Sequence, residues 1–172
     1  ASLAIDDVRM RQNGTARKFA VSAVAGGFRF LSGMSAKSAY SINTPTATMG
    51  IRGTAFDFVI RKTAETDIII FSGLVRMCGV AGTCFRVTGD CAAVRMSNRG
   101  IARAIAKPSD RRNMITDGFR FITQQERLAK EFRADLRSCG REAMVRPAPR
   151  SGEDRPRRSA PAGPEIPGKV LK

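Results

Sequence analysis

Between residues 44 and 60 the sequence TPTATMGIRGTAFDFVI changes the parity of its apolar side chains. These residues first occupy odd positions and then even ones, namely Ala47, Met49 and Ile51, followed by Phe56, Phe58 and Ile60. Because successive side chains of a strand point to opposite faces, such a switch requires an extra residue at a bulge or corner. Gly50 and Gly53 stand on either side of Arg52 and can supply it. The stretch therefore predicts a strand that bends at a glycine corner.

Short β-rich runs recur between turn residues from Phe19 to Met96, and a second parity switch falls across Gly26 and Gly27. Strands of this length and spacing are typical of all-β domains, and repeated corners favour a tightly curled sheet over a flat one. We expect residues 1–96 to form one antiparallel β domain of sandwich, roll or β-solenoid-like type. The sequence LVRMCGVAGTCFRVTGD indicates a hairpin within it, with its loop between two cysteines.

Residues 123–140 show the signals of an amphipathic helix. Thr123 followed by Glu126 matches a capping box, and Gly140 suits a helix end. The apolar residues at helical spacing are Phe121, Leu128, Phe132, Leu136 and Cys139. We expect this helix to dock against the β domain.

Two further segments flank the predicted helix. Residues 97–122 are less regular and are interpreted as an irregular connection. Residues 141–172 are rich in Arg and Pro and poor in large apolar residues, which predicts a disordered tail.

The composition limits the classes of function. The chain has 172 residues and no histidine, which removes the residue most used for general acid–base chemistry and metal binding near neutral pH. No catalytic constellation is recognisable, so we expect no enzyme, no cofactor and no metal site. Thirty Lys and Arg against fifteen Asp and Glu give a net charge of +15. Such a charge attracts nucleic acid, anionic lipid or glycan, or acidic protein surfaces, and it also serves solubility alone.

Four cysteines allow two disulfides. Cys78 and Cys84 flank the predicted hairpin loop, where paired strand positions can face each other at disulfide distance. Cys91 and Cys139 could form a second bridge that pins the helix to the sheet. Four buried free thiols in a reducing compartment remain the alternative. A zinc site would require a C-x-x-C knuckle or histidines, and the sequence has neither.

Arg52 at the glycine corner has two interpretations. In the structural one its guanidinium binds carbonyl groups or a carboxylate such as that of Asp57 and holds the corner in place. In the functional one it is a binding residue that receives an acidic group from a partner. Pro45 holds Thr44 extended and lacks a backbone donor, which suits a strand start or an edge.

Three stretches resemble the FecR-type domain of bacterial periplasmic proteins: GGFRFLSG at 26–33, YSINTPTATMGIRGTAFDFVI at 40–60 and TDIIIFSGLVRMCGVAGTCFRVTGD at 66–90. The similarity covers roughly residues 3–96. The residues of the family motif are Thr44, Pro45, Ala47, Thr48, Gly50, Ile51, Arg52, Gly53, Thr54 and Phe56. The resemblance implies an all-β periplasmic domain that binds or transmits a signal, and stand-alone secreted members are the closer match.

The predicted function is a non-enzymatic binding or regulatory module in envelope signalling, acting on an envelope protein or an anionic ligand. We expect a periplasmic or secreted location. The chain starts at Ala1 without a leader pattern, as a processed or truncated product would, and its longest apolar run is IIIF at 68–71. The alternative is a basic module for nucleic acid or another anionic polymer. Nucleic acid is disfavoured because the strands lack aromatic stacking residues and no recognition motif is present.

Overall fold

The computed structural model describes residues 1–32, 40–89 and 91–139, so the predicted tail at 141–172 lies outside the described residues. The described chain is mostly β, which confirms the predicted fold class. The strands are β1 (Ser2–Met10), β2 (Ala16–Leu31), β3 (Tyr40–Asn43), β4 (Ala47–Ile60), β5 (Thr66–Gly79), β6 (Cys84–Thr88), β7 (Ala92–Met96) and β8 (Ala102–Ala104). The helices are α1 (Pro108–Gly118) and α2 (Arg120–Thr123), followed by 3-10 turns at Gln125–Arg127, Lys130–Phe132 and Arg137–Cys139.

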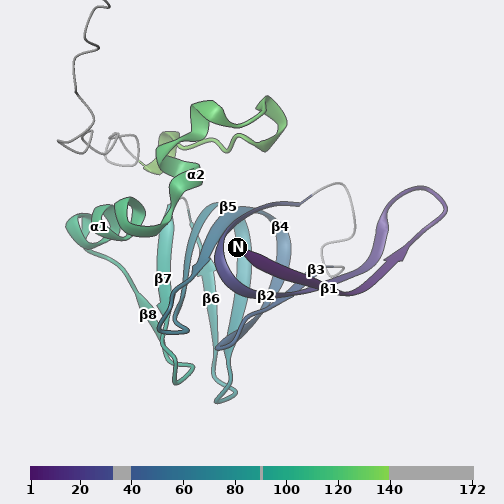
Figure 1. The fold of residues 1–172 in the computed structure, drawn as a ribbon, viewed down its shortest axis with the longest axis horizontal. Helices are drawn as coiled ribbons and strands as arrows, with labels where there is room; N and C mark the ends of the chain where they lie inside the picture. Colours follow the sequence, from purple (N-terminus) through teal and green to yellow (C-terminus); the bar gives the residue numbers. More distant parts are fainter. Residues whose placement is uncertain (33–39, 90, 140–172) are drawn as a thin grey trace, which may run out of the picture.

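The described strands form one open, curled sheet of eight strands (Figure 1). Its order is β1-β2-β3-β4-β5-β7-β8, with β6 paired to the second half of β5. The sheet is antiparallel except where β2 pairs with β3 in parallel, which corrects the expectation of a wholly antiparallel sheet. Strand β2 is long enough to pair with β3 through its first half and with β4 through its second half. This double pairing of β2 curls the sheet around its inner face.

The predicted corner in β4 lies at Gly53 and coincides with a corner in β5. Arg52 pairs with Leu74 and Ala55 pairs with Ser72, so two residues of β4 face Gly73 alone. Both Gly53 and Gly73 have positive φ, 54° and 85° respectively. A second register shift follows at once, because Phe56 pairs with the residue of β5 that lies two positions away from the partner of Ala55. Because each strand gains one extra residue, both change parity together and their apolar faces remain on the same side.

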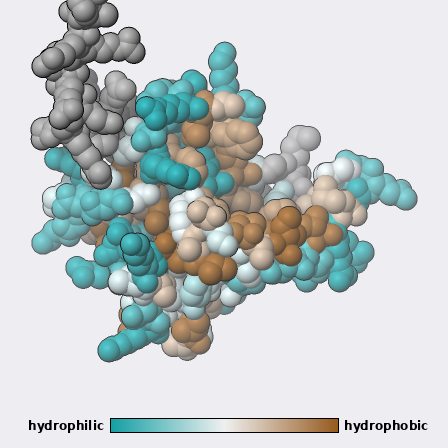
Figure 2. All heavy atoms as spheres, viewed as in Figure 1, coloured by the Kyte–Doolittle hydropathy of each residue, from teal (hydrophilic) through white to brown (hydrophobic). Residues whose placement is uncertain are grey.

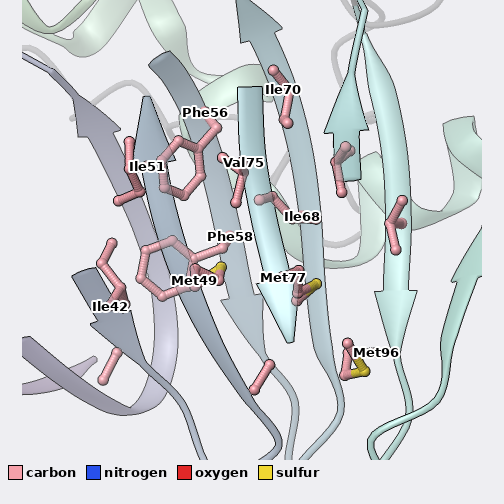
Figure 3. Close-up of a cluster of buried hydrophobic side chains, with 14 of the residues drawn as sticks. Ile42, Met49, Ile51, Phe56, Phe58, Ile68, Ile70, Val75, Met77 and Met96 are labelled. Carbon is pink, nitrogen blue, oxygen red and sulfur yellow. The ribbon is translucent and has the colours of Figure 1, made fainter. Parts of the chain in front are cut away.

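The inner face of the curled sheet contains the main hydrophobic core (Figure 3). Residues on both sides of the corner point into it, as the two parity classes of β4 predict. Its fully buried large members include Ile42, Met49, Ile51, Phe56, Phe58, Ile68, Ile70, Val75, Met77 and Met96. Burial of this many large apolar side chains is the main source of stability for the β domain.

A second apolar cluster covers part of the outer face. Ile69 and Phe71 of β5 and Ala93 of β7 point outward and pack against residues that follow the sheet in sequence. The covering residues are Met114, Ile115, Phe119, Ile122, Ala134, Leu136 and Cys139. In Figure 1 this cover lies over one end of the sheet only. The outer face of β6 and of the adjoining halves of β4 and β5 carries none of these residues.

The helix predicted for residues 123–140 is wrong. Helix α1 and most of α2 occur instead within the segment 97–122 that was interpreted as irregular, and the described residues 124–139 contain only 3-10 turns and extended links. The start of α1 carries signals that favour a helix, namely Pro108 in its first turn and the acidic Asp110 close behind.

Side-chain bonds to the backbone explain why the chain does not continue as a helix after Thr123. The Gln125 amide accepts from the Ala134 N–H at 3.0 Å and donates to the Ala134 carbonyl at 2.8 Å. The Arg133 guanidinium donates to the carbonyls of Leu128 and Glu126 at 2.9 and 3.0 Å. These bonds satisfy backbone groups in a looped path and replace the helical ones. No capping bond from Thr123 forms, since its hydroxyl donates back to Arg120 within α2.

At the opposite end of the molecule β1 and β2 form a hairpin that projects from the curled sheet (Figure 1). Leu3, Ile5 and Met10 of β1 are 45%, 67% and 58% exposed, and Figure 2 shows apolar side chains gathered along this region. Within the described part of the chain, no helix is both long and apolar enough to span a membrane.

Candidate functional site

The uncovered outer face of β4, β5 and β6 brings the corner arginine together with two others. Register alone aligns the outward side chains in three rows across these strands. The rows are Thr48–Cys78–Cys84, Gly50–Arg76–Arg86 and Arg52–Leu74–Thr88. Directly paired side chains on one face lie within about 5.5 Å at Cβ and diagonal ones within about 8 Å. Arg52, Arg76 and Arg86 therefore form one basic cluster.

These arginines line a surface hollow of about 560 Å³, called here the arginine hollow. Its lining also includes Gly50, Leu74 and Cys84. Gly50 matters because a Cβ built there would meet no atom within 4 Å, so the missing side chain leaves open space beside Arg76. The hollow is large enough to admit a carboxylate or phosphate group with part of the molecule that carries it.

The charge of the arginine hollow is not balanced by described acidic residues. The side chains of Arg52 and Arg86 form no hydrogen bond or ion pair with another described residue, and the Arg76 guanidinium donates only to the Cys84 sulfur, at 3.2 Å. Arg76 and Arg86 are directly paired across β5 and β6, an arrangement in which like charges repel. A bound anion would relieve this repulsion and accept the guanidinium donors.

Other arginines of the sheet are paired with carboxylates. Arg29 forms a two-pronged bond with Asp57 at 2.7 and 2.8 Å, and Arg95 does the same with Asp67 at 2.6 and 2.9 Å. Arg61 also donates to Asp67, at 2.5 Å. The fold thus pairs these fully or partly buried arginines with carboxylates and leaves those of the arginine hollow open to solvent.

The carboxylate suggested as a partner for Arg52 is bound elsewhere. Asp57 pairs directly with Arg29 across β4 and β2 and is only 1% exposed, so an ion pair between Asp57 and Arg52 does not form. Burial raises the pKa of Asp57 to about 6, and the hydrogen bond and charge of Arg29 oppose that rise. This correction removes the specific structural role proposed for Arg52, which is exposed at the rim of the corner.

The other motif residues shape the scaffold around Arg52. The hydroxyl of Thr44 and the N–H of Thr44 both donate to the Ala47 carbonyl, and this closes the turn that contains Pro45 between β3 and β4. Gly53 forms the corner, and Phe56 is fully buried in the inner core. Thr54 is buried beside the corner, and its hydroxyl has no hydrogen-bond partner among the described residues. The motif therefore positions Arg52 through its turn, its corner and its core anchor.

The two cysteine pairs lie at disulfide distance. The sulfur atoms of Cys78 and Cys84 are 2.20 Å apart at paired positions of β5 and β6, and those of Cys91 and Cys139 are 1.99 Å apart. The first pair borders the arginine hollow, whereas the second joins the β7 end of the sheet to the last 3-10 turn of the cover.

Thiol labelling tests the pairing of Cys78 with Cys84 in the purified protein. Denatured without reductant, the chain is expected to incorporate no label at Cys78 or Cys84, because oxidised sulfurs do not react with alkylating reagents. The same sample treated with reductant first should label all four cysteines. Labelling of Cys78 and Cys84 without reductant contradicts the prediction and removes the argument for an oxidising compartment.

Sequence reasoning found Arg52 but missed Arg76 and Arg86. The signal was present, because a hairpin that pairs Cys78 with Cys84 also pairs the residues two positions away on each strand, which are these arginines. Within the described residues, no group of three or more His, Cys, Asp or Glu side chains is placed to hold a metal ion.

Residues 4–76 match the family model described as FecR protein. This segment is a FecR domain. The match runs from β1 into β5, so the FecR domain contains Arg52 and Arg76, while Arg86 and the cysteine pairs lie beyond it. FecR is a regulatory, envelope-associated family. No curated protein matches the chain.

Proposed function

We propose that the FecR domain and the β6 hairpin form a non-enzymatic binding module that receives an anionic group of an envelope partner in the arginine hollow. The observation that carries this proposal is the contrast between two sets of arginines. Arg29, Arg61 and Arg95 are held by carboxylates of the same chain. The arginines of the hollow have no such partner among the described residues, although two of them oppose each other directly.

The chemistry of the arginine hollow suits recognition and not turnover. Guanidinium groups present planar forks of donors that match carboxylate and phosphate oxygens and stay protonated at every physiological pH. They can bind and orient an anion, but they do not supply a general base. Anion binding at this place bridges β4, β5 and β6 beside the glycine corner, so that a partner bound there contacts three strands of the regulatory domain at once.

A binder of nucleic acid or another anionic polymer is the competing function, and the net charge of +15 favours it. The two functions differ in whether the loss of affinity depends on which arginine is removed. A polymer held by overall charge loses a similar increment of affinity for any arginine removed, and its binding falls steeply with salt. Recognition in the arginine hollow depends on the arginines that line it.

The substitution Arg52→Ala separates these functions. N-acetyl-diglutamate, titrated into the labelled protein by NMR, is expected to bind on the order of tenfold more weakly to this variant, since a charge-assisted bond is lost. The melting temperature should change by less than about 2 °C, because the Arg52 side chain is exposed and bonds to no described residue.

Arg17→Ala is the matched control, because Arg17 is an exposed arginine of β2 in the projecting hairpin and the charge change is identical. It should leave diglutamate binding unchanged. Equal weakening by both substitutions would favour binding by overall charge. A large fall in melting temperature for Arg52→Ala with unchanged binding would restore the structural interpretation of Arg52.

A further inference from the structure

One cysteine of the predicted Cys78–Cys84 disulfide lines the arginine hollow. Cys84 is exposed and belongs to its lining, whereas Cys78 is half-buried on the neighbouring strand. The Arg76 guanidinium donates to the Cys84 sulfur at 3.2 Å. Arg86 lies two positions from Cys84 on the same face of β6. A small molecule held in the arginine hollow therefore meets the Cys84 sulfur beside two guanidinium groups.

The second cysteine pair has a different setting. Cys91 and Cys139 are 2% and 6% exposed and pack in the apolar cluster of the outer face. Thiol–disulfide exchange requires that an incoming thiolate reaches one sulfur of the disulfide. Buried cysteines in apolar surroundings are inert for this reason. Within one chain, access therefore favours exchange at the pair beside the arginine hollow.

The guanidinium groups also favour the charged species of such an exchange. The attacking group is a thiolate, and the departing cysteine leaves as a thiolate, so both are negatively charged. Cys78 lies two positions from Arg76 on the same face of β5, about 7 Å along the strand. Positive charge near a cysteine stabilises its thiolate. Cys78 is therefore placed to act as the leaving group when Cys84 is attacked.

The charge of the hollow describes the incoming thiol. Its volume of about 560 Å³ admits a small molecule, and the open space at Gly50 adjoins Arg76. A thiol that also carries carboxylates can place them on Arg76 and Arg86 while its sulfur faces Cys84. Carboxylates match the donor forks of guanidinium groups, so such a thiol is held close to the sulfur that it attacks.

From this arrangement we infer that the Cys78–Cys84 disulfide is an exchange site for small thiols that carry carboxylates. The incoming thiolate forms a new sulfur–sulfur bond to Cys84, and the bond between Cys84 and Cys78 breaks. The electron pair of the broken bond leaves on Cys78 as a thiolate, which takes a proton from solvent. The incoming sulfur is thereby oxidised to the disulfide level, and Cys78 is reduced.

The product is a mixed disulfide whose carboxylates occupy the arginine hollow. Modification of Cys84 would therefore exclude the anionic group of a partner from the same place. This consequence alone rests on the proposed function. The exchange itself requires only the disulfide and the arginines beside it.

Two thiols of different charge test the inference, namely mercaptosuccinate with two carboxylates and neutral 2-mercaptoethanol. Each is added at the same pH and ionic strength to the parent protein and to the variants Arg86→Ala, Arg52→Ala and Arg17→Ala. Quenching with iodoacetamide alkylates the released cysteine and preserves the adduct, which mass spectrometry of proteolytic fragments assigns to a residue. The ratio of the two rate constants is compared between variants, because the intrinsic reactivity of each thiol is the same in all of them.

The ratio of the mercaptosuccinate rate to the 2-mercaptoethanol rate should fall on the order of tenfold with Arg86→Ala, since a charge-assisted bond to a carboxylate is lost. The Arg86 side chain is exposed and bonds to no described residue, so the fold should remain intact. Arg52 lies two strands and four residues from Cys84, about 16 Å away. Arg52→Ala should lower the ratio by less than about twofold because of this distance, and Arg17→Ala should leave it unchanged.

The site of the adduct is a second readout. Mercaptosuccinate should be found on Cys84, with carbamidomethyl on Cys78 and no adduct on Cys91 or Cys139. An adduct on Cys78 in place of Cys84, or equal reaction of the buried pair, overturns the inference. So does labelling of Cys78 and Cys84 without reductant, because no disulfide would then be present to exchange.

The outcomes separate the exchange site from the proposed function. If Arg86→Ala leaves the rate ratio unchanged, the exchange site fails, while diglutamate binding and its response to Arg52→Ala decide the anion site independently. If diglutamate binding ignores Arg52→Ala while the ratio responds to Arg86→Ala, the proposed function fails and the exchange site stands. Equal falls of the ratio with Arg86→Ala and Arg17→Ala assign the preference to overall charge and overturn the exchange site.

Discussion

Gly73→Ala is expected to lower the free energy of unfolding by about 3 kcal/mol, the sum of a left-handed backbone cost and a steric one. Gly73 has a φ of 85°, and a Cβ built there would lie 2.2 Å from the carbonyl oxygen of Gly53. The obstacle is backbone of the facing strand, so no side chain can rotate away. The two corners must separate to admit a methyl group. Urea unfolding followed by circular dichroism measures the loss.

Gly82→Ala provides the matched control for this prediction. Gly82 has nearly the same φ, 83°, but a Cβ there meets nothing within 4 Å. Only the backbone cost applies, so a loss of about 1 kcal/mol is expected. The difference between the variants then measures how closely β4 and β5 approach at the corner. Equal losses would show that the corner tolerates a side chain and that the glycine is there for its φ alone.

The corner itself could be predicted from the sequence because parity is a local property. Ile51 and Phe56 cannot both face the core of an unbroken strand, and Gly53 lies between them. What the sequence did not indicate was that β5 bends at the same place. That coincidence depends on the pairing of Arg52 with Leu74, and register between strands is set by the whole sheet.

The failure at residues 123–140 has a different cause. Helical spacing of apolar residues is necessary for an amphipathic helix but does not exclude a looped chain that buries a few of the same residues. Leu136 is buried against the outer face, whereas Phe132 is 57% exposed. Gln125 and Arg133 stabilise the looped path through bonds to backbone carbonyls that no periodicity analysis considers.

The candidate site was predictable in part. Arg52 was found because glycines flank it, but its neighbours Arg76 and Arg86 required the register of the hairpin. The partner of Asp57 was assigned wrongly because proximity in sequence favoured Arg52. The structure gives Asp57 to Arg29, which is 28 residues away and lies directly opposite on β2. Long-range pairing of β2 with β4 therefore decides which arginine remains free to bind a partner.

That pairing also yields the second large effect, since Arg29→Met should lower the free energy of unfolding by about 3–5 kcal/mol at pH 7. The side chains of Arg29 and Asp57 are 5% and 1% exposed. Arg29 also donates to Gln125 at 2.8 Å and to the Phe132 carbonyl at 3.1 Å, so it joins the sheet to its cover. Methionine fills a similar volume but leaves the Asp57 carboxylate buried without a countercharge.

Arg95→Met is the matched control, because Asp67 would keep its bond from Arg61 and the Arg95 side chain is 34% exposed. Its loss should be no more than about half that of Arg29→Met, since one countercharge remains and the lost one is partly solvated. Equal losses would indicate that the loss of stability comes from removing an arginine of a two-pronged pair. A buried carboxylate left without a countercharge would then not be its cause.

The pH dependence of the unfolding free energy of the Arg29→Met variant tests whether the buried charge of Asp57 causes the loss of stability. In the parent protein the pKa of Asp57 is raised from its ordinary value of 3.8 to about 6, so its contribution to stability is full below about pH 4 and is lost as pH rises through about 6. Removing Arg29 takes away the interactions that lower this pKa, so the pKa of Asp57 rises further.

The stability deficit of the Arg29→Met variant should therefore shrink as pH falls from 7 to 5, because a proton then neutralises the Asp57 carboxylate that has lost its countercharge. A deficit that stays constant or grows over this range, measured by urea unfolding at each pH, would show that lost packing and hydrogen bonds to the cover, and not the buried charge of Asp57, account for the role of Arg29.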